Sequence, residues 1–313
     1  MGQYVFGVDI GGTSVKLGLF DVKGILLDKW EIPTRTDDSG SHILPDIADS
    51  INSKIEEKQL EREQIEGVGV GAPGPIDSAG VVHKAVNLGW DTFSIKVTLE
   101  ELLHLPVMAG NDANVAALGE MWKGGGQGSR DLVLVTLGTG VGGGIIVDGK
   151  VLTGAVGAGG EIGHIHVEDD ETECCNCGNK GCLEQYASAT GITRLANKKL
   201  KESDKDSILR SGEVSAKTVF DAVKEKDELA MEVADEFGRY LGSALAVIAG
   251  VVNPDAIVIG GGVSKAGEIL MDYIRPYFEK NAFHGSRDVK FSLATLGNDA
   301  GIYGAARLML DIK

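Results

Sequence analysis

The sequence predicts an α/β protein built from two lobes with a cleft between them, and three observations carry this prediction. The chain has 313 residues, which at roughly 150 residues per domain is long enough for two domains that each bury an apolar core. Residues 5–27 and 132–152 share one order of strand, glycine turn, strand, Asp, Lys/Gly turn and strand. Segments with the apolar spacing of helices follow both of them. We therefore expect a duplicated β-meander with covering helices.

The first lobe is expected to be a sheet covered by helices. Short apolar segments between glycine turns predict its strands, at residues 4–8, 15–20, 25–27, 67–71 and 106–110. Isoleucines recur at every fourth position from Ile43 to Ile55, which places them on one face of a helix that covers the sheet. A helix at 113–122 follows the strand at 106–110, so Asp112 stands at a strand-to-helix junction.

The second lobe is expected to repeat this arrangement. Its strands are predicted at 132–136, 144–152 (with a turn inside), 256–259 and 289–295, and its helices at 228–252 and from 267 onward. A terminal helix at 300–310 is expected to return to the first lobe. The predicted lobes are therefore residues 1–115, joined by about 298–313, and residues 116–297, which contain all the cysteines.

The charge balance limits the partners of the chain. It carries 30 Lys and Arg against 46 Asp and Glu, a formal net charge of −16, and such a surface repels phosphate backbones and anionic lipids. The longest nearly apolar segment, residues 241–252, is shorter than the roughly 18 residues that a membrane span needs. The first residues lack a basic region before an apolar stretch. We expect a cytoplasmic protein that binds neither nucleic acid nor membrane.

Two glycine turns are candidate phosphate-binding sites. The first, Asp9 to Thr13, joins two predicted strands, so its N–H groups and the Thr13 hydroxyl can face a phosphate while Asp9 holds Mg²⁺ through water. The second, residues 138–143, satisfies the G-x-G-x-x-G pattern of dinucleotide-binding folds, but that pattern requires a following helix and hairpin sequence follows here. The two turns are expected to clamp the phosphates of a nucleotide between them. A plain Gly-Gly hairpin is the alternative for the first.

Two further positions have both a structural and a functional interpretation. Asn111-Asp112 is typical of a helix N-cap, but a carboxylate at the mouth of a cleft is also what a hydroxyl needs to attack a γ-phosphoryl group. Residues 260–262, three glycines, end a buried strand. They form either a plain strand-to-helix turn or a bare backbone surface against which an adenine ring can lie.

The cysteines indicate a metal site. The four of them fall within residues 174–182, at Cys174, Cys175, Cys177 and Cys182. In a reducing cytosol such crowding favours a metal over a disulfide, and three thiolates together with His164 or His166 complete a tetrahedral Cys₃His zinc site. A free thiol cluster and a strained disulfide are the alternatives.

Six motifs, in this order along the chain, resemble those of the ROK family of sugar kinases, repressors and open reading frames. They are Asp9-Ile10-Gly11-Gly12-Thr13, Ala72-Pro73-Gly74-Pro75, Asn111-Asp112-Ala113-Asn114, residues 137–144 (LGTGVGGG), Gly160-Glu161-Ile162-Gly163-His164, and Cys175-x-Cys177-Gly178-x-x-Gly181-Cys182-x-Glu184. The resemblance spans nearly the whole chain and is greatest to the bacterial glucokinases of the family. It implies the actin-like, ribonuclease H-like ATPase fold in two lobes.

The resemblance also implies a role for each matching residue. Asp112 is expected to be the general base for the sugar hydroxyl. The other expected sugar-binding residues are Gly74, Asn87, Asn111, Glu161, His164 and Glu184. The expected nucleotide-binding residues are Asp9, Gly11, Gly12, Thr13, Lys16, Gly138, Thr139, Gly140, Gly142, Gly261 and Gly262. The implied ligands of a structural zinc ion are His164, Cys175, Cys177 and Cys182. His164 would then serve metal and sugar with opposite ring nitrogens.

The expected activity is ATP- and Mg²⁺-dependent phosphorylation of a hexose, with glucose to glucose 6-phosphate as the first choice and a homodimer as the expected assembly. N-acetylmannosamine, N-acetylglucosamine, mannose, allose or fructose are alternative sugars, and polyphosphate is an alternative donor. The family's repressors offer a different class, a sugar-sensing regulator, but they carry a DNA-binding segment ahead of the first phosphate turn, and eight residues precede Asp9 here. The doubled cysteine leaves open whether Cys174 or Cys175, and whether His164 or His166, binds zinc.

Overall fold

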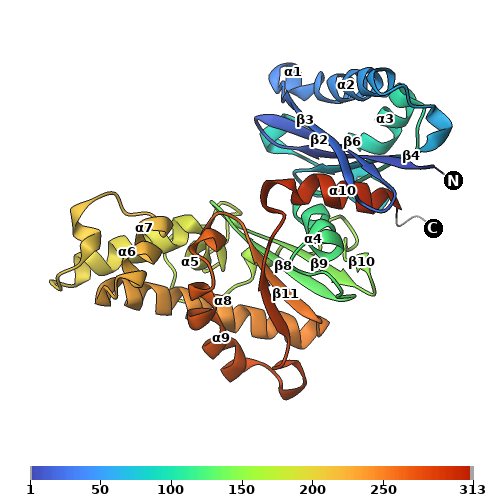
Figure 1. The fold of residues 1–313 in the computed structure, drawn as a ribbon. Coiled ribbons are helices and arrows are strands. Elements are labelled where there is room, and N and C mark those ends of the chain that lie inside the picture. Colours follow the sequence, from blue (N-terminus) through green and yellow to red (C-terminus); the bar gives the residue numbers. More distant parts are fainter. Residues whose placement is uncertain (1, 311–313) are drawn as a thin grey trace. The chain divides into compact units, whose positions relative to one another are not determined.

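The computed structural model describes residues 2–310, which form an α/β protein of two compact units (Figure 1). Unit 1 comprises residues 1–128, 144–160 and 296–313, and unit 2 comprises residues 129–143 and 161–295. The lobe boundary expected after residue 115 falls inside helix α4 (Asp112–Lys123). Unit 1 extends past that point because α4 packs along helix α10 (Ala300–Leu310), which belongs to the same unit.

The sheet of unit 1 has the strand order β3-β2-β1-β4-β7. Its strands are β1 (Tyr4–Ile10), β2 (Ser14–Asp21), β3 (Leu26–Pro33), β4 (Ile65–Ala72) and β7 (Val107–Asn111). β1 to β3 form the expected antiparallel meander, whereas β1, β4 and β7 run parallel. The register pairs Asp9 with Gly71 and Gly71 with Gly110. The carboxyl ends of the parallel strands therefore bring Asp9 and Asp112 to the same edge of the sheet.

Helices cover both faces of this sheet, because alternate residues of a strand point to opposite faces. Phe6, Val8 and Ile10 pack in one apolar core with α2 (Ile43–Glu57) and α3 (Ile95–Leu103). Val5 packs in another with α10, which lies beside β1 in Figure 1. The isoleucine spacing that predicts α2 is confirmed, since its isoleucines are buried.

Close backbone contacts hold α10 in place. A Cβ at Gly69 of β4 would overlap with the main chain of Ala305, and one at Gly304 would overlap with the carbonyl oxygen of Val115 in α4. Only glycine allows these approaches. Part of the high glycine content of the chain thus serves helix packing rather than ligand binding.

The second sheet has the order β10-β9-β8-β11-β12 and repeats the pattern of the first. Its strands are β8 (Leu132–Leu137), β9 (Val141–Val147), β10 (Lys150–Val151), β11 (Ala256–Gly260) and β12 (Lys290–Leu293). β11 runs parallel to both β8 and β12. The predicted duplication of the β-meander is confirmed, with a third strand of only two residues in the second copy.

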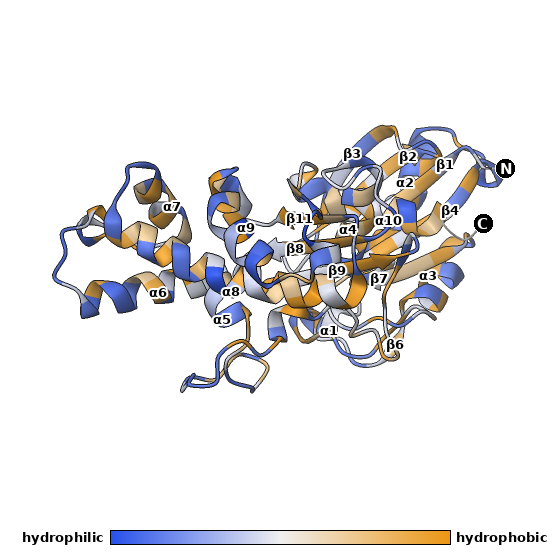
Figure 2. Cartoon of the chain, turned by 90° about the horizontal axis from the view of Figure 1, so that it is seen from below, coloured by the Kyte–Doolittle hydropathy of each residue, from blue (hydrophilic) through white to orange (hydrophobic). Residues whose placement is uncertain are grey.

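The remaining elements are mainly the helices of unit 2. They are α5 (Glu184–Ala187), α6 (Ala189–Glu202), α7 (Ala216–Lys224), α8 (Glu228–Val252) and α9 (Ile269–Asn281). Unit 1 adds the short α1 (Asp37–Gly40) and the pair β5 (Val81–Val82) and β6 (Phe93–Ser94). Figure 2 shows hydrophobic strands and helices that alternate between hydrophilic and hydrophobic residues, as amphipathic helices do. None of the helices within residues 2–310 is both long and apolar enough to span a bilayer.

Candidate active site and metal centre

The first glycine turn lies between β1 and β2 and is braced from a neighbouring segment. Gly11 donates a backbone hydrogen bond to the carbonyl oxygen of Ser14 at 3.0 Å, which closes the turn. Thr34 Oγ1 donates to the carbonyl oxygen of Gly11 at 2.7 Å. The backbone N–H of Thr34 donates to the carbonyl oxygen of Thr13 at 3.0 Å. Gly12 and Thr13 are thus held at the tip of a hairpin whose two ends are both fixed.

Asp9 lies directly before this turn in an unusual electrostatic environment. Burial raises its pKa to about 6, the ammonium group of Lys16 opposes the rise, and the carboxylate of Asp112 adds to it. Lys16 faces Asp9 across the hairpin and its Nζ donates to the carbonyl oxygen of Asn298 at 3.2 Å. Two carboxylates that raise one another's cost of ionisation form a site that a divalent cation would stabilise.

The structure at the junction of β7 and α4 shows which residue of Asn111-Asp112 caps the helix. Asn111 is the N-cap: its Oδ1 accepts from the N–H groups of Ala113 at 3.0 Å and Asn114 at 3.2 Å. Asp112 is the first residue of α4, it is exposed, and its Oδ1 accepts from the Ala113 N–H at 2.8 Å. Asp112 is therefore not needed as a cap, and its carboxylate stands at the positive end of the helix dipole.

Gly74 and Asn87 lie in the loops after β4. Gly74 has a φ of +94°, and its carbonyl oxygen accepts a hydrogen bond from Asn111 Nδ2 at 3.1 Å. The amide of Asn111 is thus engaged at both ends, so it positions the β7–α4 junction whatever else it binds. Asn87 is exposed, in a short 3₁₀ turn at Val86–Leu88.

The second glycine turn lies between β8 and β9 in unit 2. Gly138 donates to the carbonyl oxygen of Gly140 at 2.9 Å and accepts from the N–H of Ala189 at 2.8 Å. The N–H of Val141, the first residue of β9, donates to Glu184 Oε2 at 3.0 Å. Glu184, expected to bind sugar, therefore also contacts the turn that is expected to bind phosphate.

A cavity of about 310 Å³ lies near the third glycine cluster of unit 2 and has mostly apolar walls. Its lining residues include Ala189, Ala216, Phe220, Gly262, Val263 and Ala266. Gly261 has a φ of +83° and, with Gly262, forms the turn after β11. Ala189 joins this cavity to the second glycine turn, because its N–H bonds to Gly138. The sequence indicated the glycines but gave no signal for Phe220 or Ala216, which come from the distant α7.

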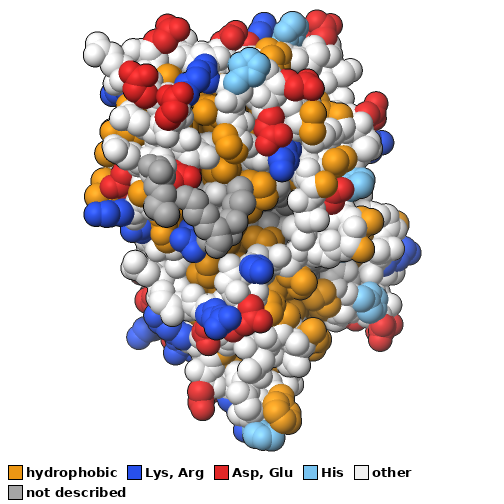
Figure 3. Space-filling model, turned by 90° about the vertical axis from the view of Figure 1, so that its right-hand side faces the viewer, with side chains coloured by type: hydrophobic (Ala, Val, Ile, Leu, Met, Phe, Trp, Pro, Cys, Tyr) orange, Lys and Arg blue, Asp and Glu red, His pale blue; other side chains and the backbone are white. Residues whose placement is uncertain are grey.

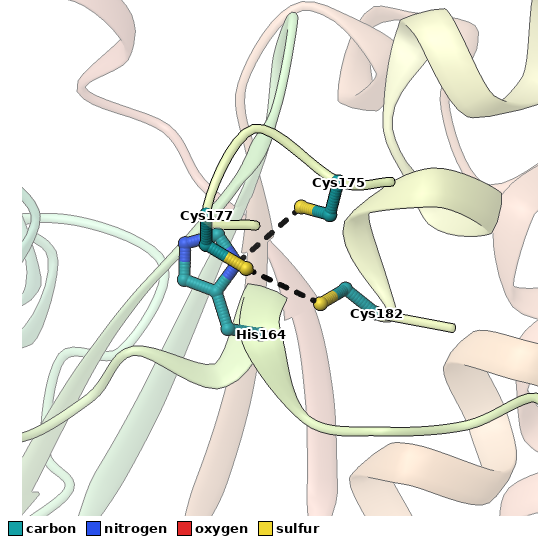
Figure 4. Close-up of side chains that lie close together, drawn as sticks. All are labelled: His164, Cys175, Cys177 and Cys182. Atoms are coloured by element: carbon teal, nitrogen blue, oxygen red, sulfur yellow. Dashed lines mark hydrogen bonds between the residues drawn. The ribbon is translucent and has the colours of Figure 1, made fainter. Parts of the chain in front are cut away.

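The four implied metal ligands come together around one point (Figure 4). Cys175, Cys177, Cys182 and His164 each offer a ligand atom within 4.8 Å of the others. Cys175 Sγ lies 3.7 Å from His164 Nδ1, and Cys177 Sγ lies 3.6 Å from Cys182 Sγ. Zinc–sulfur bonds of about 2.3 Å at tetrahedral angles place ligand atoms about 3.8 Å apart. The spacing of the cluster thus suits tetrahedral zinc.

The acidity of the thiols determines which protons a metal must displace on binding. Burial raises the pKa of Cys175, and burial together with the neighbouring sulfurs raises the pKa of Cys182 to about 12. Backbone hydrogen bonding lowers the pKa of Cys177. Three thiolates this close together require a cation to offset their charge.

The structure distinguishes between the alternative ligands that the sequence left open. Cys174 is exposed and lies outside the cluster. His166 bonds elsewhere, with Nδ1 at 3.0 Å from the carbonyl oxygen of Lys180 and Nε2 at 2.8 Å from Asp169 Oδ1. In contrast, His164 directs Nδ1 to the cysteines and Nε2 toward Glu161, whose Oε2 lies 4.0 Å away. His164 thus presents opposite nitrogens to the metal cluster and to an exposed carboxylate.

Comparisons with known proteins show which family the chain and its fold resemble. The model of the ROK family matches residues 5–312. A glucokinase of Halalkalibacterium halodurans is 45% identical over 98% of this chain and 95% of its own length. A ROK hexokinase structure from Thermus thermophilus superimposes with a TM-score of 0.81 at 32% identity, covering 97% of both chains. A ROK family glucokinase structure from Streptomyces griseus, in complex with glucose and AMPPNP, superimposes with a TM-score of 0.73 at 35% identity, covering 97% of this chain and 98% of that one.

The fold and these similarities therefore define a sugar kinase-like protein with the actin-like two-lobed fold. The chain belongs to the ROK family.

Proposed function

We propose that this protein phosphorylates glucose with ATP and forms glucose 6-phosphate. The observation that carries the proposal is its similarity, over almost the full chain, to glucokinases that are 36–45% identical. The ROK family glucokinase structure that holds glucose and AMPPNP also matches 97% of this chain. The expected homodimer and cytoplasmic location remain predictions. Acidic and basic side chains are interspersed on the face in Figure 3, and the expectation that nucleic acid is not a partner remains a prediction.

In the proposed reaction Asp112 is the general base. Its carboxylate accepts the proton of the attacking sugar hydroxyl while that oxygen forms a bond to the γ-phosphorus of ATP. ADP leaves as the bond between the γ-phosphorus and the bridging oxygen breaks. The position at the N-terminus of α4 favours the charged carboxylate. Asn111 holds this position through the cap and the bond to Gly74.

The proposed nucleotide contacts lie on the glycine turns. The N–H groups of the turns Gly11–Thr13 and Gly138–Gly140, other than those of Gly11 and Gly138 that close the turns, would bind phosphate oxygens, with Lys16 and Gly142 close by in sequence. The adenine ring of the nucleotide would occupy the cavity beside Gly262, since apolar walls next to bare backbone suit a flat aromatic ring. Asp9 would hold Mg²⁺ through water, and the ion would supply positive charge near the transferred phosphoryl group.

The proposed sugar contacts lie mainly on the cysteine loop. Glu161, His164 and Glu184 would bind sugar hydroxyls together with Asn111, Gly74 and Asn87. His164, Cys175, Cys177 and Cys182 would hold a structural zinc ion, since four protein ligands fill a tetrahedral site. The task of the metal would be to fix the loop that carries these side chains.

A coupled ADP-release assay with glucose and a panel of hexoses and N-acetylhexosamines tests the proposal. Glucose should give the highest kcat/KM, and Asp112→Asn should abolish most of the rate on every sugar. A higher kcat/KM on another sugar would reassign the substrate. Activity with polyphosphate but not ATP would reassign the donor, and sugar binding without ADP release would favour the regulator.

A further inference from the structure

The carboxylate of Glu184 connects two features of unit 2 to which the proposed function assigns different tasks. Its Oε2 accepts the N–H of Val141 at 3.0 Å, directly after the second glycine turn. Its Oε1 lies 3.5 Å from Cys175 Sγ in the metal cluster. One side chain therefore reaches from the turn to a metal ligand.

The fit on the side of the turn is close. A Cβ at Gly140 would overlap with the carboxylate of Glu184, so only glycine leaves room for this contact. The main chain that follows Glu184 contacts the turn again, since Ala189 N–H donates to the carbonyl oxygen of Gly138 at 2.8 Å. Residues 184–189 thus hold both ends of the turn.

The fit on the side of the metal cluster is equally direct. Glu184 begins α5 only two residues after Cys182. The next residue, Gln185, accepts from the N–H of Cys182 at 3.0 Å and donates from Nε2 to the carbonyl oxygen of Glu173 at 3.0 Å. The start of α5 is therefore part of the cysteine loop and must follow any movement of its ligands.

We propose that Glu184 is a positioning residue that couples metal binding at the cysteine cluster to nucleotide binding at the turn Gly138–Gly140. The proposal rests on the proposed function, because it takes this turn as a phosphate site. A metal that fixes Cys182 also fixes the start of α5 two residues further on, and with it Glu184 and the turn. Nucleotide binding to a turn that is already ordered costs less conformational entropy. By linkage, the nucleotide must strengthen metal binding by the same factor.

The test measures zinc affinity without sugar, so that any sugar contact of Glu184 has no effect on the result. The zinc dissociation constant of the full chain is determined by competition with a chromophoric chelator, with and without Mg-AMPPNP. In the parent protein the nucleotide should tighten zinc binding about fivefold or more. In Glu184→Ala the ratio of the zinc dissociation constant without Mg-AMPPNP to that with Mg-AMPPNP should fall close to one. Gln185→Ala is the matched control: it loosens the cysteine loop but leaves the bond to Val141, so zinc should bind more weakly at an unchanged ratio.

The outcomes separate coupling from simple support of the loop. An unchanged ratio in Glu184→Ala would assign Glu184 a purely structural role and overturn the proposal, as would a ratio of one in the parent. If Glu184→Ala does not fold, Glu184→Asp decides, because its shorter side chain cannot reach the N–H of Val141 and must also lose the coupling. Calorimetry that finds no nucleotide binding would overturn the proposed function as well, whereas nucleotide binding without coupling would overturn this inference alone.

Discussion

Asn111 donates a hydrogen bond from Nδ2 to the carbonyl oxygen of Gly74 at 3.1 Å, while its Oδ1 caps helix α4. The residue before the proposed base therefore joins the loop after β4 to the start of α4. Because β4 and β7 are neighbours in the sheet, this bond fixes where Asp112 stands at the edge of the sheet.

Replacing Asn111 should therefore reduce stability through the cap and the interloop bond together. Asn111→Ala is expected to lower the free energy of unfolding by about 1–3 kcal/mol, since a cap contributes about 1 and the partly buried carbonyl oxygen of Gly74, left unpaired, adds to it. Urea denaturation measures this change. Asn111→Ser retains a capping oxygen but cannot reach Gly74, so its loss should be smaller; equal stability of the Ala variant and the parent would contradict both roles.

Replacing Asp112 should reduce the rate without reducing stability. Asp112→Asn is expected to lower kcat by about 10²- to 10⁴-fold, the usual contribution of a general base. The midpoint of thermal unfolding should change little, because Asn111 provides the cap of α4. If the variant phosphorylates glucose within a few-fold of the parent rate, Asp112 is not the base.

Local patterns predicted much of the fold from the sequence. The helices at 228–252 and 300–310 begin and end at the predicted residues, because the apolar spacing that predicts them lies within the segments themselves. The glycine-separated strands were predicted for the same reason. By contrast, the extension of unit 1 to residue 128 depends on packing between α4 and α10, which no local pattern contains.

The site was predictable to a similar extent. Its residue types and order indicated phosphate turns and a Cys₃His cluster, but the braces between them are long-range. Thr34 reaches Gly11 over 23 residues, and Glu184 reaches Val141 over 43. The spacing of the cysteines alone could not decide between Cys174 and Cys175, whereas the geometry does: Cys175 lies in the cluster and Cys174 lies outside it.

The raised pKa of Asp9 predicts a pH-dependent cost in stability. A carboxyl whose folded pKa is about 6, against 3.8 when unfolded, binds a proton more tightly in the folded state. Stability is therefore lost as the pH rises from about 4 to about 6, by up to about 3 kcal/mol at 1.4 kcal/mol per pKa unit. Asp9→Asn should remove this cost and be more stable than the parent at pH 7.5 without Mg²⁺, yet nearly inactive. Urea denaturation at pH 3.5 and 7.5 measures the difference, which should be close to zero at the lower pH.

Mg²⁺ should narrow the difference in stability between Asp9→Asn and the parent at pH 7.5. If Asp9 holds the ion through water, added Mg²⁺ stabilises its charged form and lowers its pKa, so the parent gains stability at pH 7.5 and Asp9→Asn does not. The kcat/KM for Mg-ATP should also fall as the pH drops through about 6, where Asp9 becomes protonated. Identical responses of parent and variant to Mg²⁺ would exclude Asp9 from the metal site.

The cysteine cluster predicts one zinc ion per chain and a clear difference between neighbouring cysteines. Cys177→Ser removes one of four ligand atoms that lie within 4.8 Å of one another, so the purified variant should lose its zinc, unfold at a lower temperature and bind glucose more weakly. Cys174→Ser is the matched control: Cys174 is exposed and outside the cluster, so zinc content, stability and glucose affinity should stay at the parent level. Metal analysis, thermal unfolding and glucose titration of the two variants provide the comparison. The three losses should occur together, because the metal binds the folded loop and its binding free energy is part of the folding free energy. Zinc lost from Cys174→Ser would show that Cys174 is a ligand, zinc retained in Cys177→Ser would exclude Cys177 from the site, and parent-level activity in protein that contains no zinc would rule out a structural metal.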